Sequence, residues 1–185
     1  MESAAPIVGT IHTFDGQAIR VRPIESCDWQ ALQRFHSTLS EQTIEQRMFD
    51  CMPSLSDERA HYFCDVDGFE RFALVALDPA DPSEIIGVVR FDREPLAHMA
   101  EYAAVITDRW QGQGVGLALT VLLIEAALDR GIDILRAYVR SNNVQMLHLL
   151  RNLGLPETVT DQGGIECIDI EIAFRRHRHL NHPMG

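Results

Sequence analysis

The chain has 185 residues, of which 46% are apolar and 23% are charged, a composition typical of one globular domain with a substantial core. Its 16 basic residues are all arginines and are outnumbered by 27 acidic residues, so the net charge is −11. The absence of lysine excludes a P-loop and any enzyme that forms a Schiff base on its own lysine. The acidic balance argues against nonspecific nucleic-acid binding and is compatible with a cationic substrate.

The cysteines and the apolar segments indicate the cellular compartment of the protein and the kinds of metal or redox site that it can contain. The four cysteines are Cys27, Cys51, Cys64 and Cys167. No two of them have the C-x-x-C spacing, so we expect reduced thiols and no metal site. Residues 1–10 lack the charge and apolar run of a signal peptide, and Leu117–Leu128 is too short to cross a bilayer. These features predict a cytoplasmic protein that does not engage membranes.

Apolar periodicity predicts alternating groups of strands and helices along the chain. We expect strands over residues 18–24, 71–77, 84–92, 99–106, 134–140, 157–160 and 166–174. We expect three helices, the first capped by Ser26 or Asp28, the second by Ser40 or Thr43 and the third by Ser54 or Ser56. We also expect a long helix that ends at Arg130 and a helix over 143–153. The early strands should pair antiparallel, and the later strand–helix–strand crossovers require parallel pairing. The result is a mixed α/β domain over residues 18–174, with a flexible lead-in over 1–17 and a tail over 175–185.

The most informative segment is the glycine-rich turn from Gln111 to Gly116, between a predicted strand and the long helix. Glycines allow a tight turn that points several N–H groups in one direction, and the helix adds its free N–H groups, so an anion such as a pyrophosphate can bind. The spacing does not fit the dinucleotide fingerprint G-x-G-x-x-G. Taken by itself, Q-x-x-G-x-G is at least as consistent with an ordinary strand–helix turn.

The surroundings of this turn carry a family resemblance. The turn, followed by Asn143-Val144-Gln145-Met146 and Leu153-Gly154-Leu155, resembles the acetyl-CoA-dependent GNAT acetyltransferases. Arg22-Pro23-Ile24 and Ala100-Glu101-Tyr102-Ala103 narrow the resemblance to the catalytic domain of bacterial Pat-type protein lysine acetyltransferases. The resemblance covers about residues 14–174. It implies a GNAT fold with a central mixed sheet of about six to seven strands, helices on both faces, and two parallel strands that diverge at the CoA site.

The resemblance also implies a set of residues that bind acetyl-CoA. The backbone of the glycine-rich turn should hold the pyrophosphate, and the pantetheine arm should run between the diverging strands, with Asn143 on its other side. The expected cofactor-binding residues are Val105, Ile106, Gln111, Gly112, Gln113, Gly114, Val115, Gly116, Leu117 and Asn143.

The resemblance places the general base at Glu101. An alkyl ammonium has a pKa of about 10.4, so it must lose a proton before its nitrogen can attack the thioester. Glu101 lies five residues before Ile106, among apolar neighbours on the strand expected to hold the thioester. The alternative is an exposed carboxylate on a strand. Many relatives also have a tyrosine that protonates the leaving thiolate, seven residues after the motif asparagine. Here that position is Leu150, so the general acid is unassigned.

The expected function is direct acetyl transfer from acetyl-CoA to an amine, and the Pat-type resemblance implies protein lysine side chains as acceptors. A small-molecule acceptor (a polyamine, an aminoglycoside or an amino acid) is the alternative within the same class. A non-catalytic sensor of acyl-CoA is a second class. We expect either a monomer or a homodimer.

Overall fold

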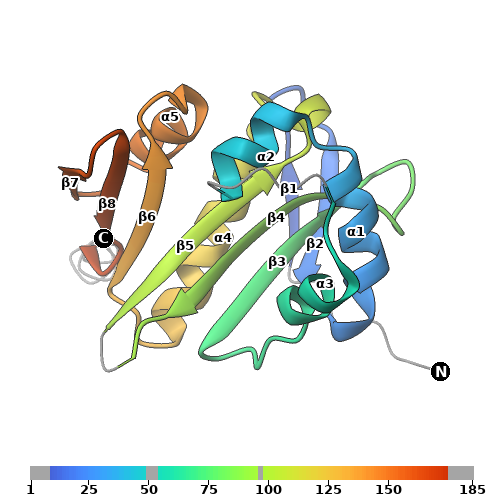
Figure 1. The fold of residues 1–185 in the computed structure, drawn as a ribbon, viewed down its shortest axis with the longest axis horizontal. Helices are drawn as coiled ribbons and strands as arrows, with labels where there is room; N and C mark the ends of the chain where they lie inside the picture. The colour runs from blue at the N-terminus through green and yellow to red at the C-terminus, as the bar shows by residue number, and fades with distance from the viewer. Residues whose placement is uncertain (1–8, 49–53, 96–97, 175–185) are drawn as a thin grey trace, which may run out of the picture.

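The computed structural model describes residues 9–48, 54–95 and 98–174, which form a mixed sheet covered by helices on both faces (Figure 1). Eight strands lie in the order β1-β2-β3-β4-β5-β6-β8-β7. The strands are β1 (Gly9–His12), β2 (Ala18–Pro23), β3 (Arg71–Leu77), β4 (Ile85–Arg93), β5 (Met99–Ile106), β6 (Ile134–Arg140), β7 (Glu157–Asp161) and β8 (Ile165–Glu171). The helices are α1 (Trp29–Ser37), α2 (Glu41–Met48), α3 (Asp57–Cys64), α4 (Val115–Asp129) and α5 (Val144–Asn152), with 3-10 turns η1 (Ser26–Asp28) and η2 (Asp108–Trp110).

The fold class expected from the sequence is confirmed, but the sheet has one strand more than expected. Strand β1 lies inside the segment predicted to be a flexible lead-in, where it pairs antiparallel with β2. It has only four residues, and only Ile11 is buried, so it is too short for an alternating pattern to be recognised. The predicted tail over 175–185 lies outside the described residues.

Local signals account for the helix boundaries. Ser56 caps α3 by accepting a hydrogen bond from the backbone of Arg59. Gly131 and Gly154 follow α4 and α5 with φ angles of 75° and 63°, the left-handed conformation that ends helices and that glycine adopts without strain. These rules let the sequence predict the elements around the site within a few residues.

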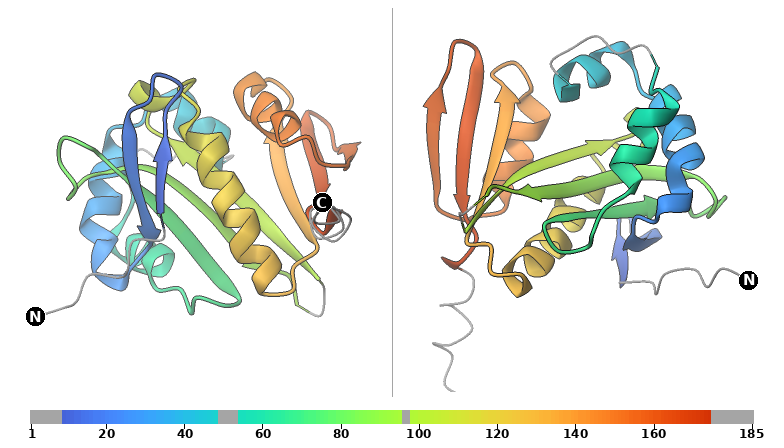
Figure 2. Two further views of the ribbon diagram at one scale, coloured as in Figure 1. Left: turned by 180° about the vertical axis from the view of Figure 1, so that it is seen from behind. Right: turned by 60° about the horizontal axis from the view of Figure 1, so that its bottom comes forward.

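Each face of the sheet carries its own apolar cluster, and the helices divide between the faces (Figure 2). Helix α4 crosses one face, where Tyr102, Ala104 and Ile106 of β5 are buried beneath it. Helices α1 and α3 cover the other face, against which Val105 packs. Side chains along β5 therefore alternate between the two faces, and Glu101 points to the α1 and α3 side. No helix among the described residues is long and apolar enough to cross a membrane.

A buried ion pair connects β2 to the start of α1. The guanidinium of Arg22 donates to both carboxylate oxygens of Asp28, at 2.6 and 2.8 Å, and Asp28 also accepts from the backbone N–H of Glu25. The Asp28 side chain is 8% exposed. We expect Asp28→Ala to lower the free energy of unfolding by about 3–5 kcal/mol, because it leaves a buried guanidinium without its partner. Urea denaturation measures the loss.

The matched control is the exposed pair of Arg34 with Glu84, whose side chains are 50% and 36% exposed. Arg34→Ala should cost less than about 1 kcal/mol, because water screens that pair. Equal losses for Arg34→Ala and Asp28→Ala would contradict the distinction drawn between the buried and the exposed pair.

Candidate functional site

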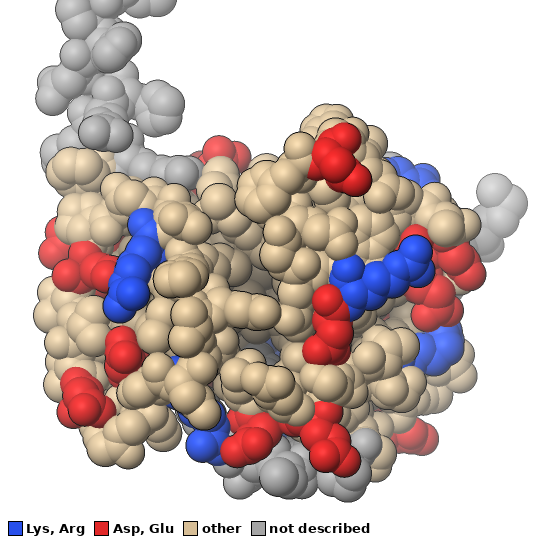
Figure 3. Space-filling view, turned by 90° about the horizontal axis from the view of Figure 1, so that it is seen from above, with Lys and Arg blue, Asp and Glu red and all other residues tan. Residues whose placement is uncertain are grey.

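A cavity of about 330 Å³ opens where β5 and β6 separate, between the glycine-rich turn, α2 and α5. Seen from above, the surface is hollowed near its centre, and uncharged side chains dominate around the hollow (Figure 3). Of the residues predicted to form the site, the cavity is lined by Glu101, Val105, Ile106, Gln111, Gly112, Gly114, Gly116, Leu117 and Asn143. Residues separated by up to 42 positions in the chain are thus brought to one place.

The cavity arises because the parallel pairing of β5 with β6 ends early. The register runs from Met99 opposite Ile134 to Tyr102 opposite Ala137, and stops there. Both strands continue, β5 to Ile106 and β6 to Arg140, without pairing to each other. Backbone N–H and C=O groups require hydrogen-bond partners. A ligand that carries amides can supply them between the separated strand ends.

The glycine-rich turn presents the start of α4 to the cavity. Gly112 and Gly114 have φ angles of 70° and 89°, which reverse the chain tightly. No side chain in the described part of the chain caps α4, so the N–H groups of its first turn remain available, and the helix dipole favours an anion there. Gly116 allows close packing, since a Cβ atom would lie 2.8 Å from Cδ1 of Leu149.

Two residues of the turn do not line the cavity with their side chains. Gln113 donates from its side chain to the carbonyl oxygen of Arg109, at 2.7 Å. Val115 is 1% exposed and belongs to the core beneath α4. Any contact of Gln113 or Val115 with a ligand would therefore come from the backbone.

A chain of hydrogen bonds connects the turn to α2. The side-chain amide of Gln111 donates to the carbonyl oxygen of Ile106 at 2.9 Å and to the hydroxyl of Thr43 at 3.2 Å. The Thr43 hydroxyl donates to Asp108, which also accepts from the backbone and the hydroxyl of Ser40. The end of β5, the turn and the first turn of α2 are thereby held together.

This network predicts a pH dependence of stability. Burial raises the pKa of Asp108, but the hydrogen bonds from Ser40 and Thr43 outweigh it, so the pKa lies below the ordinary value of 3.8. Because the folded pKa is lowered, the stabilisation is present above pH 3.8 and is lost as pH falls through the folded value. We expect urea unfolding between pH 5 and pH 2.5 to show a smaller loss of stability for Asp108→Asn than for the wild type.

The matched control is Glu157→Gln, which removes an exposed carboxylate of β7. It should retain the wild-type pH dependence. If Asp108→Asn also retained it, the hydrogen bonds would not favour the ionised carboxylate.

Glu101 belongs to a row of charged residues that crosses the sheet on one face. The strand registers place Arg71 opposite Asp92, Asp92 opposite Glu101, Glu101 opposite Arg136, and Arg136 opposite Asp169. Directly opposite residues project to the same face, so their side chains are neighbours. Glu101 therefore lies between one acidic residue and one basic residue.

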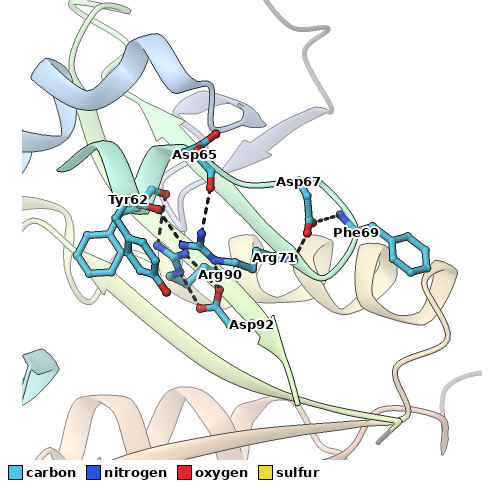
Figure 4. Close-up of polar contacts among 8 residues, drawn as sticks. Tyr62, Asp65, Asp67, Phe69, Arg71, Arg90 and Asp92 are labelled. Carbon is cyan, nitrogen blue, oxygen red and sulfur yellow. Dashed lines mark hydrogen bonds and ion pairs between the residues drawn. The ribbon is translucent and has the colours of Figure 1, made fainter. Parts of the chain in front are cut away.

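Both neighbours of Glu101 are already engaged. Asp92 forms ion pairs with Arg71 and Arg90 at 2.9 and 3.2 Å, and Figure 4 shows the two guanidinium groups converging on it. Arg136 donates twice to Asp169, at 2.7 and 2.8 Å. Within the described part of the chain, Glu101 has neither an ion pair nor a hydrogen bond from a side chain. Its carboxylate is exposed and lines the cavity, so it is free to accept a proton from a ligand.

The start of α5 forms the other side of the cavity. The Asn143 side chain caps this helix by accepting from the backbone N–H of Met146 at 3.1 Å. Leu150, the position at which the family resemblance implied a tyrosine, is 2% exposed and packs in the core. That position therefore cannot supply a proton to a ligand.

The structure adds cavity residues that sequence reasoning missed. Phe14 is 79% exposed and comes from the turn between β1 and β2, which was expected to be part of the lead-in. Tyr138 is 38% exposed and lies just beyond the last residue of β6 that pairs with β5. Thr43 and Gln46 come from α2. A large aromatic residue beside the Asp-Gly turn was the one signal that could have indicated Phe14.

The cysteines provide no evident nucleophile. Burial raises the pKa of the Cys64 thiol to about 12, so it stays protonated at neutral pH. None of the three cysteines that the structure describes, Cys27, Cys64 and Cys167, lines the cavity. In the ranges that the structure describes, no group of three or more His, Cys, Asp or Glu residues could hold a metal ion.

Comparison with known proteins places this geometry among acetyltransferases. The Acetyltransferase (GNAT) family profile matches residues 29–155. The crystal structure of the GNAT domain of S. lividans PAT superposes with a TM-score of 0.82 and 29% identity, covering 88% of this chain and 96% of that chain. A cAMP-binding acyltransferase from Mycobacterium smegmatis has the same fold, with a TM-score of 0.63 and 22% identity over 89% of this chain and 46% of that one.

Two curated relatives are also similar in sequence. Acetyltransferase Pat of Mycolicibacterium smegmatis is 29% identical over 151 residues, or 81% of this chain. Mycothiol acetyltransferase of Jonesia denitrificans is 36% identical over 76 residues, or 40% of this chain. The chain covers 45% and 24% of these relatives' lengths, so the likeness concerns one part of each.

Proposed function

Because the chain belongs to the GNAT acetyltransferase family, we propose that it transfers an acetyl group from acetyl-CoA directly to an amine, with Glu101 as the general base. The observation that carries this proposal is the cavity itself. It combines a carboxylate that has no ion-pair partner among the described residues, two separated parallel strands, and a glycine-rich turn at a helix N-terminus. These three parts match the three parts of the reaction: the amine, the pantetheine arm and the pyrophosphate.

The cosubstrate would lie along the cavity with its ends in different environments. The pyrophosphate accepts hydrogen bonds from backbone N–H groups over residues 111–117, at the positive end of α4. The pantetheine amides pair with the backbone of Val105 and Ile106, beyond the last β5–β6 pair. Asn143, at the start of α5, contacts the arm from the opposite side.

Glu101 would remove the proton that makes the substrate amine unreactive. The protonated amine enters as a cation, which a free carboxylate attracts, and passes one proton to Glu101 directly or through one water. The neutral nitrogen then attacks the thioester carbonyl carbon. An arginine paired with Glu101 would compete with the amine for the carboxylate. Arg136 is instead paired with Asp169, and Arg71 is paired with Asp92.

The tetrahedral intermediate carries negative charge on the former carbonyl oxygen. A backbone N–H in the segment 104–106 can donate to that oxygen as the charge develops. Collapse breaks the carbon–sulfur bond and releases CoA as a thiolate, whose pKa of about 8.5 allows departure without an acid. This fits the burial of Leu150, which offers no proton.

We favour protein lysine side chains as acceptors. The similarity to the GNAT domain of S. lividans PAT covers 96% of that domain, and it supports a Pat-type acceptor. The acceptor would approach over the segment 26–65, where α2 lines the cavity with Thr43 and Gln46. Exposed acidic residues along this segment, including Asp57, Glu58 and Asp65, favour a cationic partner. Asp50, in the same segment, lies outside the described residues.

The test has two steps. Calorimetric titration with acetyl-CoA should show saturable micromolar binding, or about −8 kcal/mol. Protein substrates with accessible lysines should then gain acetyl groups, detected by mass spectrometry, faster than polyamines, aminoglycosides or amino acids. Absence of binding up to millimolar acetyl-CoA would remove the whole proposal. Binding with transfer only to small amines would retain the reaction and replace the acceptor.

A further inference from the structure

One large aromatic side chain is displayed at the mouth of the cavity instead of being buried. Phe14 is 79% exposed at the turn between β1 and β2, yet its ring lies against the glycine-rich turn. A Cβ atom on Gly114 would be 2.8 Å from Cε1 of the Phe14 ring. The backbone N–H of Phe14 donates to the carbonyl oxygen of Gln113 at 3.0 Å. The two turns, about a hundred residues apart in sequence, are thus joined.

The turn that carries Phe14 is held in shape by its own polar groups. The hydroxyl of Thr13 accepts from the backbone N–H of Gln17 at 2.9 Å and is hydrogen-bonded to the carboxylate of Asp15. The backbone of Thr13 also pairs with Gln17 and Gly16. Thr13 itself is buried. The backbone that presents the ring is therefore ordered, although the ring adds nothing to the apolar core.

The position of the ring within the cavity indicates which end of the cosubstrate Phe14 can contact. Glu101 and Ile106 are five residues apart on β5, or about 17 Å at the rise of an extended strand. Phe14 lies beyond Ile106, at the glycine-rich turn. The acetyl group belongs at the Glu101 end and the pyrophosphate at the glycine-rich turn, so Phe14 lies where the nucleotide continues from the pyrophosphate.

We propose that Phe14 binds the nucleotide end of the acyl donor by stacking its ring on the adenine base. This inference rests on the proposed function. An adenine is a flat aromatic group, and stacking on an aromatic side chain is the usual way to bind a base without reading its edges. The ring is already positioned by the turn, so little conformational entropy is lost when the base binds. Burial of the exposed ring face adds apolar contact.

The test compares acetyl-CoA with S-acetyl-4′-phosphopantetheine, an acyl donor that keeps a phosphate for the glycine-rich turn but lacks the adenosine. Phe14→Ala should raise the KM for acetyl-CoA about tenfold, or about 1.4 kcal/mol, and leave the KM for S-acetyl-4′-phosphopantetheine unchanged. Phe14→Trp should keep the wild-type KM for acetyl-CoA. Phe69→Ala, which removes another exposed phenylalanine that does not line the cavity, is the matched control and should change neither value. Thermal unfolding confirms that each variant folds.

The outcomes separate this inference from the proposed function. If wild-type protein binds and uses acetyl-CoA but Phe14→Ala does so equally well, the stacking contact is refuted. If Phe14→Ala weakens both donors equally, the ring supports the shape of the turn and not the base, which also overturns the inference. If wild-type protein does not bind acetyl-CoA at all, the proposed function fails first.

Discussion

Replacing Glu101 with Gln is expected to lower kcat by about a hundredfold to ten-thousandfold while leaving the Kd for acetyl-CoA unchanged. The two side chains have nearly the same shape, so β5 and the cavity should be preserved. The amide cannot accept the proton that the ammonium must lose. The remaining activity should come from the small fraction of amine that is already neutral. It should therefore rise with pH, as a larger fraction of the amine becomes neutral.

Steady-state kinetics from pH 6 to pH 9, together with calorimetric titration of each variant, checks this expectation. Glu94→Gln is the matched control, since Glu94 pairs with Arg136 at 3.6 Å but does not line the cavity. It should keep kcat within about twofold of the wild type, as expected for a partly exposed pair. A Glu101→Gln enzyme as fast as the wild type across this pH range would eliminate Glu101 as the base.

Gly114→Glu is expected to weaken acetyl-CoA binding by at least about a hundredfold. Three effects act together. The φ angle of 89° strains any residue with a Cβ atom, and that atom would collide with the Phe14 ring. The added carboxylate would also occupy the helix N-terminus and repel the pyrophosphate. Calorimetric titration measures the loss directly.

A control is available at the opposite end of the same helix. Gly131 follows α4 with a φ angle of 75°, and a Cβ atom there would meet nothing within 4 Å. Gly131→Glu imposes comparable backbone strain, so it should lower the melting temperature while acetyl-CoA binding stays at the wild-type level. Equal loss of binding in both variants would mean that strain in α4, and not the anion site, explains the result.

The sequence predicted the fold, and most of the residues proposed for the site line the cavity, because the relevant signals are local. The glycine-rich turn predicts the start of α4, and Asn143 predicts the start of α5, from the local sequence alone. The strand that carries Glu101 was predicted over 99–106, the bounds that β5 has in the structure. The resemblance to a family then supplied the chemistry that these local patterns could not.

What the sequence could not predict depends on pairing between distant segments. The charged row from Arg71 to Asp169 exists only because five strands adopt one register, and no spacing within the chain encodes it. Phe14 reaches the cavity because β1 pairs with β2 and carries its turn to Gln113. Tyr138 lines the cavity because pairing stops one residue earlier. Each is a consequence of tertiary structure.

The early end of the β5–β6 pairing has a consequence for the stability of the domain. Four residue pairs, from Met99–Ile134 to Tyr102–Ala137, join the two halves of the sheet along these strands. A donor that binds the folded chain alone raises its unfolding free energy by about 2.7 kcal/mol at a hundred times its Kd, or about 5–10 °C in melting temperature. Amide hydrogens over 103–106 and 138–140 should then exchange more slowly. The acyl donor would act as a temporary strand that closes the sheet, and product release would open it again.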